Sequence, residues 1–310
     1  MKRWISYALV AGFIAVMGLR LLENQSHDWS VPQPLGMTWL TWLFVINCAL
    51  TVAICLHSAV ELLGPRAAAA FVAITVGLGA FFETTGVKYA WWFGEYSYSD
   101  VLGWKLAGVP VIVPLMWFAL AYMGYIISNL MMFNTPVHPQ VPPRLPLGRR
   151  TLLNVVLSIP PAMIVLAYDL GADPYMVLIR AWTSPRGVWQ IGLHGVTFQR
   201  GVPGVQYFHE SIQGFRGWFF AVLCMMFVFR LVVREPRVVP ATKSSVRAAL
   251  WPIFLYWGFS WFQYVFGQPP DTTMIAAVAM GIPVVFGIAG WVLYYLTMST
   301  AGSDREGATT

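Results

Sequence analysis

The stretch Phe82–Trp117, FETTGVKYAWWFGEYSYSDVLGWKLAGVPVIVPLMW, decides how the rest of the chain is interpreted. It leaves one apolar run next to the carboxylate of Glu83, crosses a loop that holds Glu95 and Asp100, and enters a second apolar run. Seven aromatic residues fall within sixteen positions of this stretch: Tyr89, Trp91, Trp92, Phe93, Tyr96, Tyr98 and Trp104. Rings at this density form a belt at a membrane interface or line a cavity for an apolar ligand. Composition alone favours the belt, and the acidic residues among the rings argue for the cavity.

The composition is that of an integral membrane protein. The 310 residues are 58% hydrophobic and 10% charged, whereas a soluble domain carries about 25% charged residues. The net charge of +6 is explained by basic residues at membrane edges, so we expect no nucleic-acid partner. The three cysteines lie in apolar runs without a CxxC pair, which predicts packing roles rather than disulfides or a metal site.

Apolar runs of spanning length, about 20 residues each, predict an all-α bundle of eight transmembrane helices. We expect these helices near residues 4–22, 38–60, 67–86, 109–132, 151–169, 217–233, 248–266 and 274–298. The seventh run is the least apolar, so seven spans are the alternative. The first run has no small-x-small cleavage site at its end, which favours a retained span over a signal peptide.

The distribution of charge predicts the orientation of the bundle. With eight spans, 12 of the 19 Lys and Arg residues lie on the side that holds both termini. The positive-inside rule therefore places the N- and C-termini in the cytoplasm of a protein of the cell (inner) membrane. Nine of the 13 acidic residues lie toward the outer side, and this clustering requires another cause because acids carry little topological weight.

A proline-rich segment divides the chain. We expect a semi-rigid linker at 135–148, between an N-terminal half at 1–134 with the aromatic and acidic loop 87–107, and a C-terminal half at 149–298. The small and polar residues 299–310 predict a disordered tail.

Glu83 is the clearest candidate for chemistry, because an ionisable residue within a span is a functional hypothesis by default. Thr84 and Thr85 follow it and could donate hydrogen bonds to its carboxylate. The alternative is an interface carboxylate paired with Lys88.

Asp169 and Asp173 stand four residues apart, so they share one face if the helix continues. Pro174 disfavours helical geometry at Asp173, which could instead cap a new helix at Tyr175–Trp182. The spacing is also that of the DxxxD motif with which intramembrane prenyltransferases hold magnesium diphosphate. The outer placement of the pair and the lack of a second acidic motif argue against that interpretation.

His57 and Glu61 are also four residues apart. A metal site needs at least three protein ligands, and no third candidate is evident. A hydrogen-bonded pair is the better interpretation, and we expect no metal.

A set of motifs runs from His57 to Trp218. In chain order they are His57-x-x-x-Glu61-x-x-Gly64, Glu83-x-x-Gly86, Phe93-Gly94-x-Tyr96-x-Tyr98, Gly108-Val109-Pro110, Pro114-x-x-Trp117, Asp169-x-x-x-Asp173-Pro174-x-Met176-Val177, Trp182 and Gly217-Trp218. With these motifs the chain resembles the carotenoid hydratase family of the bisanhydrobacterioruberin hydratase type, polytopic carotenoid biosynthesis proteins. The resemblance implies addition of water across the terminal double bond of an acyclic carotenoid, with no cofactor.

The chain departs from this family at residues 183–216. The family has a short block with an asparagine before Gly-Trp, whereas here Gly201-Val202-Pro203 is followed by the longer segment VQYFHESIQGFR. His209, Glu210 and Gln213 stand where the asparagine is missing. His209 is the natural base to hold the attacking water, and a solvated outer loop is the alternative.

Hydration of a trisubstituted alkene predicts which residue types the site needs. Protonation of carbon requires a carboxylic acid kept neutral, and burial in an apolar site raises a carboxyl pKa. Aromatic faces stabilise the tertiary cation by about 0.5–2 kcal/mol each, and a second group deprotonates the water. The candidate catalytic residues are Glu83, Asp169, Asp173, Glu95, His209 and Glu61. The candidate substrate-binding rings are Trp91, Trp92, Tyr96, Tyr98, Trp117, Trp182 and Trp218.

Two other functions remain open. The same residues would serve a proton-initiated terpene cyclase or isomerase acting on a polyprenyl substrate, if the site excluded water instead of supplying it. A non-catalytic membrane protein that binds lipid or pigment is the third interpretation. In each case the expected partners are a polyene or isoprenoid from the bilayer and the membrane lipids, with water as co-substrate of a hydratase.

Overall fold

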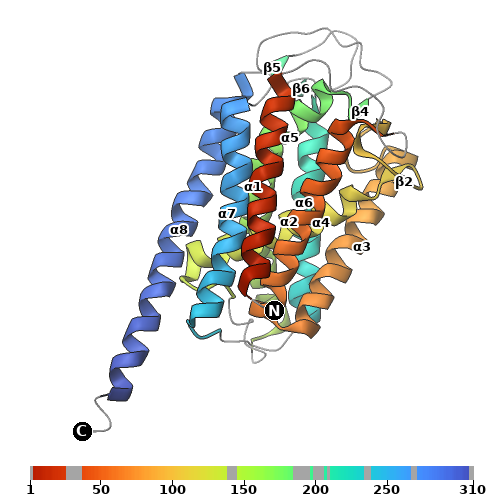
Figure 1. Cartoon of the computed structure of the whole chain (residues 1–310). Coiled ribbons are helices and arrows are strands. Elements are labelled where there is room, and N and C mark those ends of the chain that lie inside the picture. Colours follow the sequence, from red (N-terminus) through yellow and green to blue (C-terminus); the bar gives the residue numbers. More distant parts are fainter. Residues whose placement is uncertain are drawn as a thin grey trace.

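The computed structural model describes residues 3–25, 37–137, 145–183, 196–197, 206–207, 210–233, 239–266 and 271–306. Within them, eight helices run up and down in one bundle (Figure 1), which confirms the predicted all-α fold. The helices are α1 (Arg3–Gln25), α2 (Trp39–Leu63), α3 (Pro65–Tyr89), α4 (Ile112–Phe133), α5 (Leu147–Leu178), α6 (Ile212–Val232), α7 (Lys243–Phe266) and α8 (Asp271–Glu306). Six of the described helices, α2 to α6 and α8, are long and apolar enough to cross a membrane.

Short strands lie at the end of the bundle opposite the two chain termini (Figure 1). They are β1 (Ser97–Tyr98), β2 (Lys105–Leu106), β3 (Val109–Pro110), β4 (Trp182–Thr183), β5 (Val196–Thr197), β6 (Gln206–Tyr207) and β7 (Glu210–Ser211), with a 3₁₀ turn η2 (Asp100–Leu102). β1 pairs with β4, β2 with β3, and β6 with both β5 and β7, all antiparallel. Both termini lie at one end, as eight spans require, and their cytoplasmic placement stays a prediction.

α4 is the centre of the bundle. Every residue from Trp117 to Leu130 is buried, so no face of this part of the helix reaches the surface. α4 packs against α2 and α3, which precede it in the chain, and against α5, α7 and α8, which follow it. At Gly290 of α8 the Leu130 carbonyl lies where a Cβ would stand, so only glycine permits this approach. Helices from both predicted halves therefore share one core.

A proline inside α7 is accommodated by a neighbouring helix. Pro252 has no N–H, so the carbonyl of Ala248, four residues earlier, lacks its helical partner. The Ser58 hydroxyl of α2 donates to that carbonyl at 2.7 Å. Because Ser58 has one O–H, the Tyr122 hydroxyl at 2.8 Å must donate to the Ser58 oxygen. The break in α7 thus joins α2, α4 and α7.

A proline inside α5 is accommodated in the same way, by a hydrogen bond from a neighbouring helix. Pro161 removes the partner of the Leu157 carbonyl, and Nη2 of the buried Arg230 from α6 donates to it at 3.2 Å. The guanidinium also lies over the Tyr125 ring of α4, 5.5 Å from its centroid. Proline in a membrane helix is tolerated when another helix supplies the missing hydrogen bond.

α5 corrects one prediction. It does not end near 169 but continues to Leu178 through Pro174, so the predicted new helix at Tyr175–Trp182, capped by Asp173, is wrong. The helix ends where the N–H groups of Ile179 and Ala181 bond back to the carbonyls of Tyr175 and Met176. Packing of α5 against α6, α7 and α8 outweighs the local preference of the residue before a proline.

Several other helix boundaries differ from prediction by three residues or more, those of α4 and α8 among them. α4 begins at Ile112 rather than near 109, because Val109 and Pro110 pair with β2. α8 continues to Glu306, past the expected end near 298, and extends beyond the other helices at its C-terminal end (Figure 1).

Candidate functional site

Glu83 is buried near the C-terminal end of α3, and its carboxylate accepts three hydrogen bonds. Its Oε2 accepts from the hydroxyls of Tyr96 at 2.7 Å and Tyr98 at 2.8 Å, and its Oε1 accepts from Nε1 of Trp117 at 2.9 Å. Only 3% of the Glu83 residue surface is exposed. We call Glu83, Tyr96, Tyr98 and Trp117 the Glu83 cage. All three donors are neutral side chains.

The neighbours predicted to bond Glu83 have other contacts. The Thr85 hydroxyl donates to the Phe81 carbonyl at 2.6 Å and accepts from Nε1 of Trp92 at 2.9 Å. The Lys88 ammonium lies over the Tyr89 ring, 5.1 Å from its centroid. The hydrogen bonds described for the carboxylate come instead from the loop and from α4.

Glycines on one face of α3 make room for the cage. Gly79 and Gly86 stand four residues before and three after Glu83, so all three share a helix face. A Cβ at Gly79 would lie 2.8 Å from Cδ1 of Trp117, and one at Gly86 would lie 2.8 Å from the Tyr96 hydroxyl. Gly79 was not among the predicted site residues, although a glycine one helical turn before an acid inside an apolar run indicates a close approach of another element.

Aromatic rings enclose the cage. Trp117 lies between Trp218, with ring centroids 4.2 Å apart, and Phe93, at 6.3 Å. The Tyr98 ring contacts Tyr96 at 5.4 Å and Trp182 at 5.9 Å, both edge to face. Five of the predicted substrate-binding residues thus come together: Tyr96, Tyr98, Trp117, Trp182 and Trp218.

The other rings of the loop lie outside the cage. Tyr89, Trp91 and Trp104 are each more than half exposed, as expected for side chains at a membrane interface. Trp92 stacks on Phe220 of α6 with centroids 5.6 Å apart and 14° between the planes. The loop therefore supplies both a set of exposed rings and the wall of a buried site, which the sequence had presented as alternatives.

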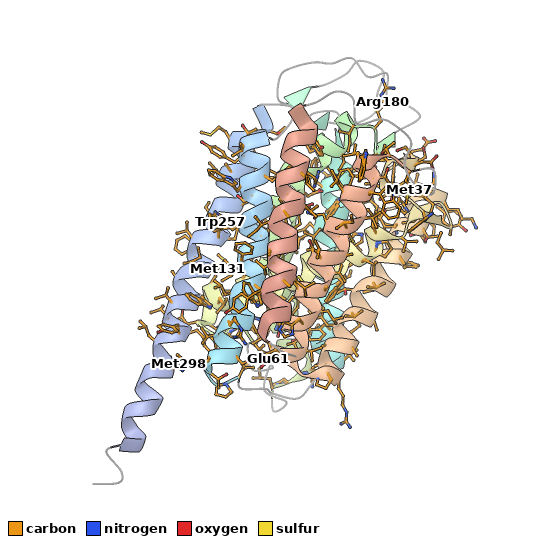
Figure 2. The ribbon with its side chains drawn as sticks, viewed as in Figure 1. Met37, Glu61, Met131, Arg180, Trp257 and Met298 are labelled. Atoms are coloured by element: carbon orange, nitrogen blue, oxygen red, sulfur yellow. The ribbon has the colours of Figure 1, made fainter. Side chains whose placement is uncertain are left out.

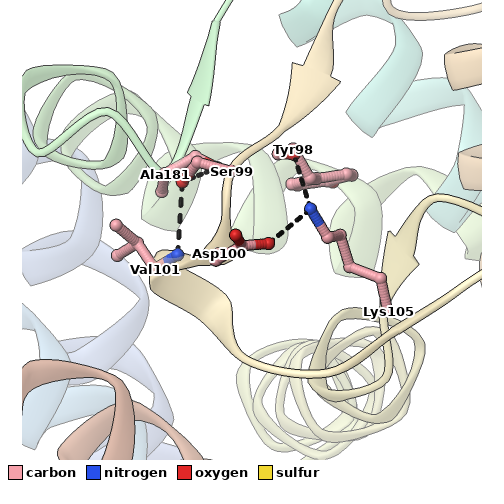
Figure 3. Close-up of polar contacts among 6 residues, drawn as sticks. All are labelled: Tyr98, Ser99, Asp100, Val101, Lys105 and Ala181. Atoms are coloured by element: carbon pink, nitrogen blue, oxygen red, sulfur yellow. Dashed lines mark hydrogen bonds and ion pairs between the residues drawn. The ribbon is translucent and has the colours of Figure 1, made fainter. Parts of the chain in front are cut away.

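The loop is tied to the end of α5 and to itself. β1 pairs with β4, and the Ser99 N–H and hydroxyl both donate to the Ala181 carbonyl, at 3.0 and 3.2 Å. Lys105 Nζ donates to the Tyr98 carbonyl at 3.2 Å and lies 2.7 Å from Oδ1 of Asp100 (Figure 3). These contacts hold the backbone of Tyr98 in place, so its hydroxyl is positioned on Glu83.

Asp169 and Asp173 lie on one face of α5, because the helix is continuous through both. Their exposed fractions are 0% and 3%. The charge of Asp173 acts on Tyr96 and Tyr98, and the charges of both aspartates act on Tyr168. Asp173 is thus the aspartate whose field reaches the Glu83 cage.

Arg20 is a functional candidate that was not among the predicted site residues. Its guanidinium is buried over the rings of Phe44, Phe262 and Tyr175, at 4.3, 4.6 and 5.8 Å from their centroids. Its charge, like those of the two aspartates, acts on Tyr168. A buried cation therefore accompanies the buried acids at this end of the bundle.

The remaining candidates are not brought to the cage. Glu61 is exposed at the lower end of the bundle, whereas Arg180, beyond the end of α5, lies at the upper end (Figure 2). With a rise of about 1.5 Å per residue, the part of α3 between Pro65, next to Glu61, and Glu83 spans about 27 Å. Glu95 is exposed, and His209 lies outside the described residues.

Metal binding receives no new support. Within the part of the chain that the structure describes, no three His, Cys, Asp or Glu side chains are grouped as ligands. The charge of Glu61 acts on His57, and the hydrogen bond between them stays a prediction. That the protein needs no metal stays a prediction.

The two tyrosines of the cage should resist ionisation. Burial, followed by the charge of Glu83, raises the pKa of Tyr96 and Tyr98 well above the ordinary value of about 10. Both hydroxyls should therefore remain donors as the pH rises through 10, and their contribution to stability should be lost only above that pH. A Tyr96→Phe/Tyr98→Phe variant should match the wild type in tyrosinate absorbance at about pH 10.

Unfolding is the control for this titration. In denaturant the wild type should show more tyrosinate than the double variant at the same pH, because the burial is lost. A difference already present in the folded proteins at that pH would contradict the geometry of the cage.

The arrangement favours acid–base chemistry at Glu83. Donors that are already oriented stabilise a carboxylate at the moment it forms, without reorganisation of solvent. The surrounding rings present faces that attract a cation. A neutral, apolar molecule next to Glu83 would thus meet a proton donor. The three hydrogen-bond donors would stabilise the carboxylate that remains, and the aromatic rings would stabilise the cation formed on the molecule.

Comparison with known proteins places this site in a wider group. The model of one family, described as carotenoid biosynthesis protein, matches residues 40–281, well over half of the chain. The match includes the Glu83 cage, Asp169 and Asp173, and it excludes Arg20. No curated protein and no solved structure matches the chain.

Proposed function

Since the chain belongs to the carotenoid biosynthesis protein family, we propose that it is a membrane-embedded hydratase acting on a carotenoid or related polyene end group. It adds water to a terminal double bond. The observation that carries this proposal is the buried Glu83 carboxyl with three neutral donors. The motifs shared with the hydratases of the bisanhydrobacterioruberin type support the same reaction.

The first step is protonation of the alkene. The acid form of Glu83 gives its proton to the CH carbon of the terminal trisubstituted double bond, and a tertiary cation forms on the neighbouring disubstituted carbon. The hydroxyls of Tyr96 and Tyr98 and the indole of Trp117, at 2.7–2.9 Å, stabilise the carboxylate that remains. Three donors directed at one carboxyl group are suited to stabilising its ionised form.

The second step is the capture of water by the cation. Trp117 bonds Glu83 and packs on Trp218 with ring centroids 4.2 Å apart, and an aromatic face stabilises a nearby cation by about 0.5–2 kcal/mol. Water then attacks, and Asp173 accepts the proton that it loses. Asp173 is preferred over Asp169 because its charge reaches the tyrosines of the cage. Glu83 and Asp173 thus act as a general acid and a general base.

The reaction can be tested with membranes that contain the full chain. Incubation with the acyclic carotenoid lycopene in heavy-oxygen water, followed by mass spectrometry, should give an alcohol that carries the heavy oxygen. A product of unchanged mass would instead support a cyclase or isomerase, and no turnover would support pigment binding. Membranes from cells without the protein are the control for non-enzymatic hydration.

A further inference from the structure

Glu83 is enclosed by its neighbours, so an apolar molecule must displace one of them to reach it. The exposed fractions of Glu83, Phe82 and Trp117 are 3%, 3% and 1%. Between α3 and α4 the wall is tight, because a Cβ at Gly79 would lie 2.8 Å from the Trp117 ring. A polyene from the bilayer therefore needs another way in.

Between α3 and α6 the wall is made by the loop. Gly217 of α6 packs on the loop, since a Cβ there would lie 2.5 Å from the Phe93 ring and 2.8 Å from the Trp92 carbonyl oxygen. The Trp92 ring stacks on Phe220 of α6, with centroids 5.6 Å apart and 14° between the planes. Phe82 of α3 meets both rings edge to face, at 5.0 and 6.1 Å. The Trp92 side chain thus fills the space between two helices.

This contact faces lipid just inside the membrane interface. α3 and α6 are both apolar enough to span, and Phe220 and Phe81 on them are 42% and 49% exposed. Exposed apolar side chains of a spanning helix lie in the hydrocarbon. Arg216, one turn nearer the start of α6, and Lys88, near the end of α3, are exposed cations, as expected at the interface. Molecules dissolved in the bilayer can therefore reach the contact between Trp92 and Phe220.

The backbone at Trp92 is strained. Its φ of 67° lies in the left-handed region, which a bulky side chain rarely adopts. The Phe93 N–H donates to the Trp91 carbonyl at 2.7 Å and closes a three-residue turn of the rare γ type. The Trp92 side chain holds this turn, because its Nε1 donates to the Thr85 hydroxyl at 2.9 Å and its ring stacks on Phe220. Strain of this kind is found in ligand clamps and switch regions, where it is released when the holding contacts part.

We propose that Trp92 and Phe220, the entrance pair, form a binding subsite in which the conjugated chain of the polyene lies between the two rings while its end group reaches Glu83. The inference rests on the proposed function, from which it takes the class of substrate. The two rings are nearly parallel, so their separation leaves a slot with two flat faces. A flat conjugated chain fits such a slot, as aromatic faces favour offset stacking. In lycopene the conjugated part begins only a few bonds from the terminal double bond.

The entrance can be tested with dicyclohexylcarbodiimide, an apolar reagent that partitions into bilayers. It adds the O–H of a neutral carboxyl across one of its C=N bonds, and the adduct rearranges to a stable N-acylurea that peptide mass spectrometry locates. With the purified full chain in nanodiscs, Glu83 should react slowly in the wild type. It should react about 10-fold faster in Phe220→Ala, because loss of a stacked pair raises the population of the open form.

A second variant and a matched control accompany this measurement. Thr85→Val keeps the shape of the side chain and removes the acceptor of Trp92 Nε1, so it should also speed the reaction, even if Phe220→Ala does not fold. Phe286→Ala removes an aromatic ring that is 57% exposed on α8 and should react at the wild-type rate. Equal rates at Glu83 in the wild type and in the two entrance variants overturn the entrance.

The class of ligand is tested by protection. Squalene carries the same end groups as lycopene on a chain without conjugation. In wild-type nanodiscs, lycopene should slow the carbodiimide reaction of Glu83 more than squalene does, by about 3-fold or more, and this difference should vanish in Phe220→Ala. Equal protection by the two compounds in the wild type overturns the assignment of the subsite to a conjugated chain.

The failure of the proposed function has a different result. If no heavy oxygen enters the product while Phe220→Ala still speeds the carbodiimide reaction and lycopene still protects Glu83, the hydratase is refuted. The entrance then stands for a polyene that is bound or cyclised instead. An alcohol carrying heavy oxygen, together with equal carbodiimide rates in all variants, overturns the entrance alone.

Discussion

Glu83→Gln should lower turnover of the polyene substrate by about 10²-fold or more, the range of a general-acid contribution. Glutamine keeps the shape of the side chain, and its amide oxygen can still accept from the two tyrosine hydroxyls, but its NH2 group cannot accept from Trp117 and it has no acidic proton. The protein should therefore insert and fold as the wild type does. The measurement is the rate of heavy-oxygen incorporation per molecule of protein, with folding checked by thermal unfolding in detergent.

Glu95→Gln is the matched control, because it makes the same chemical change in the same loop at an exposed side chain. Its activity should stay within about twofold of the wild type, since a surface change away from the site has little effect. Wild-type activity in Glu83→Gln would remove Glu83 from the mechanism and leave Asp169 and Asp173 of α5 as the other buried acids among the described residues.

Gly79→Ala should impair both stability and activity. The new Cβ would stand 2.8–2.9 Å from three atoms of Trp117, including its Cβ, so α3 and α4 must separate or the indole must rotate. Overpacking of this kind lowers the free energy of unfolding by about 1–3 kcal/mol. Rotation of the indole would also remove its hydrogen bond to Glu83. We expect a lower unfolding temperature together with a loss of turnover of about 10-fold or more.

Gly77→Ala tests the same substitution two residues away on α3, where nothing lies within 4 Å of the added Cβ. It should be neutral or slightly stabilising, because alanine favours a helix over glycine. Equal effects of the two substitutions would show that the close approach of Trp117 to Gly79 is not what holds the cage.

The number and order of the helices could be predicted because each helix contains an apolar run close to the length of about 20 residues that crosses a bilayer. The position at which α5 ends could not be predicted. A rule about Pro174 is local, whereas the continuation of the helix depends on neighbours far away in the sequence. The same holds for Ser58 and Arg230, whose roles exist only because other helices release carbonyls beside them.

The centre of the site was also predictable in part. An acid inside a span, followed by a loop of tyrosines and tryptophans, is unusual enough to single out Glu83. Spacing could not reveal that two hydroxyls meet on one oxygen, nor that Arg20 lies among three rings. Glu61 shows that a motif can also mislead. It belongs to the motif His57-x-x-x-Glu61-x-x-Gly64, but it lies on α2 at the end of the bundle far from Glu83.

The proline sites have a consequence for how the protein is made. A helix with an unbonded backbone carbonyl is unstable on its own in the hydrocarbon core of the bilayer, because no water is present there to donate a hydrogen bond to that carbonyl. α7 has such a carbonyl at Ala248 and is not among the described helices that are apolar enough to span. Ser58 of α2 and its partner Tyr122 of α4 are synthesised before α7. We therefore expect α7 to enter the bilayer against a surface that the earlier helices provide, and a Ser58→Ala variant to integrate α7 more slowly.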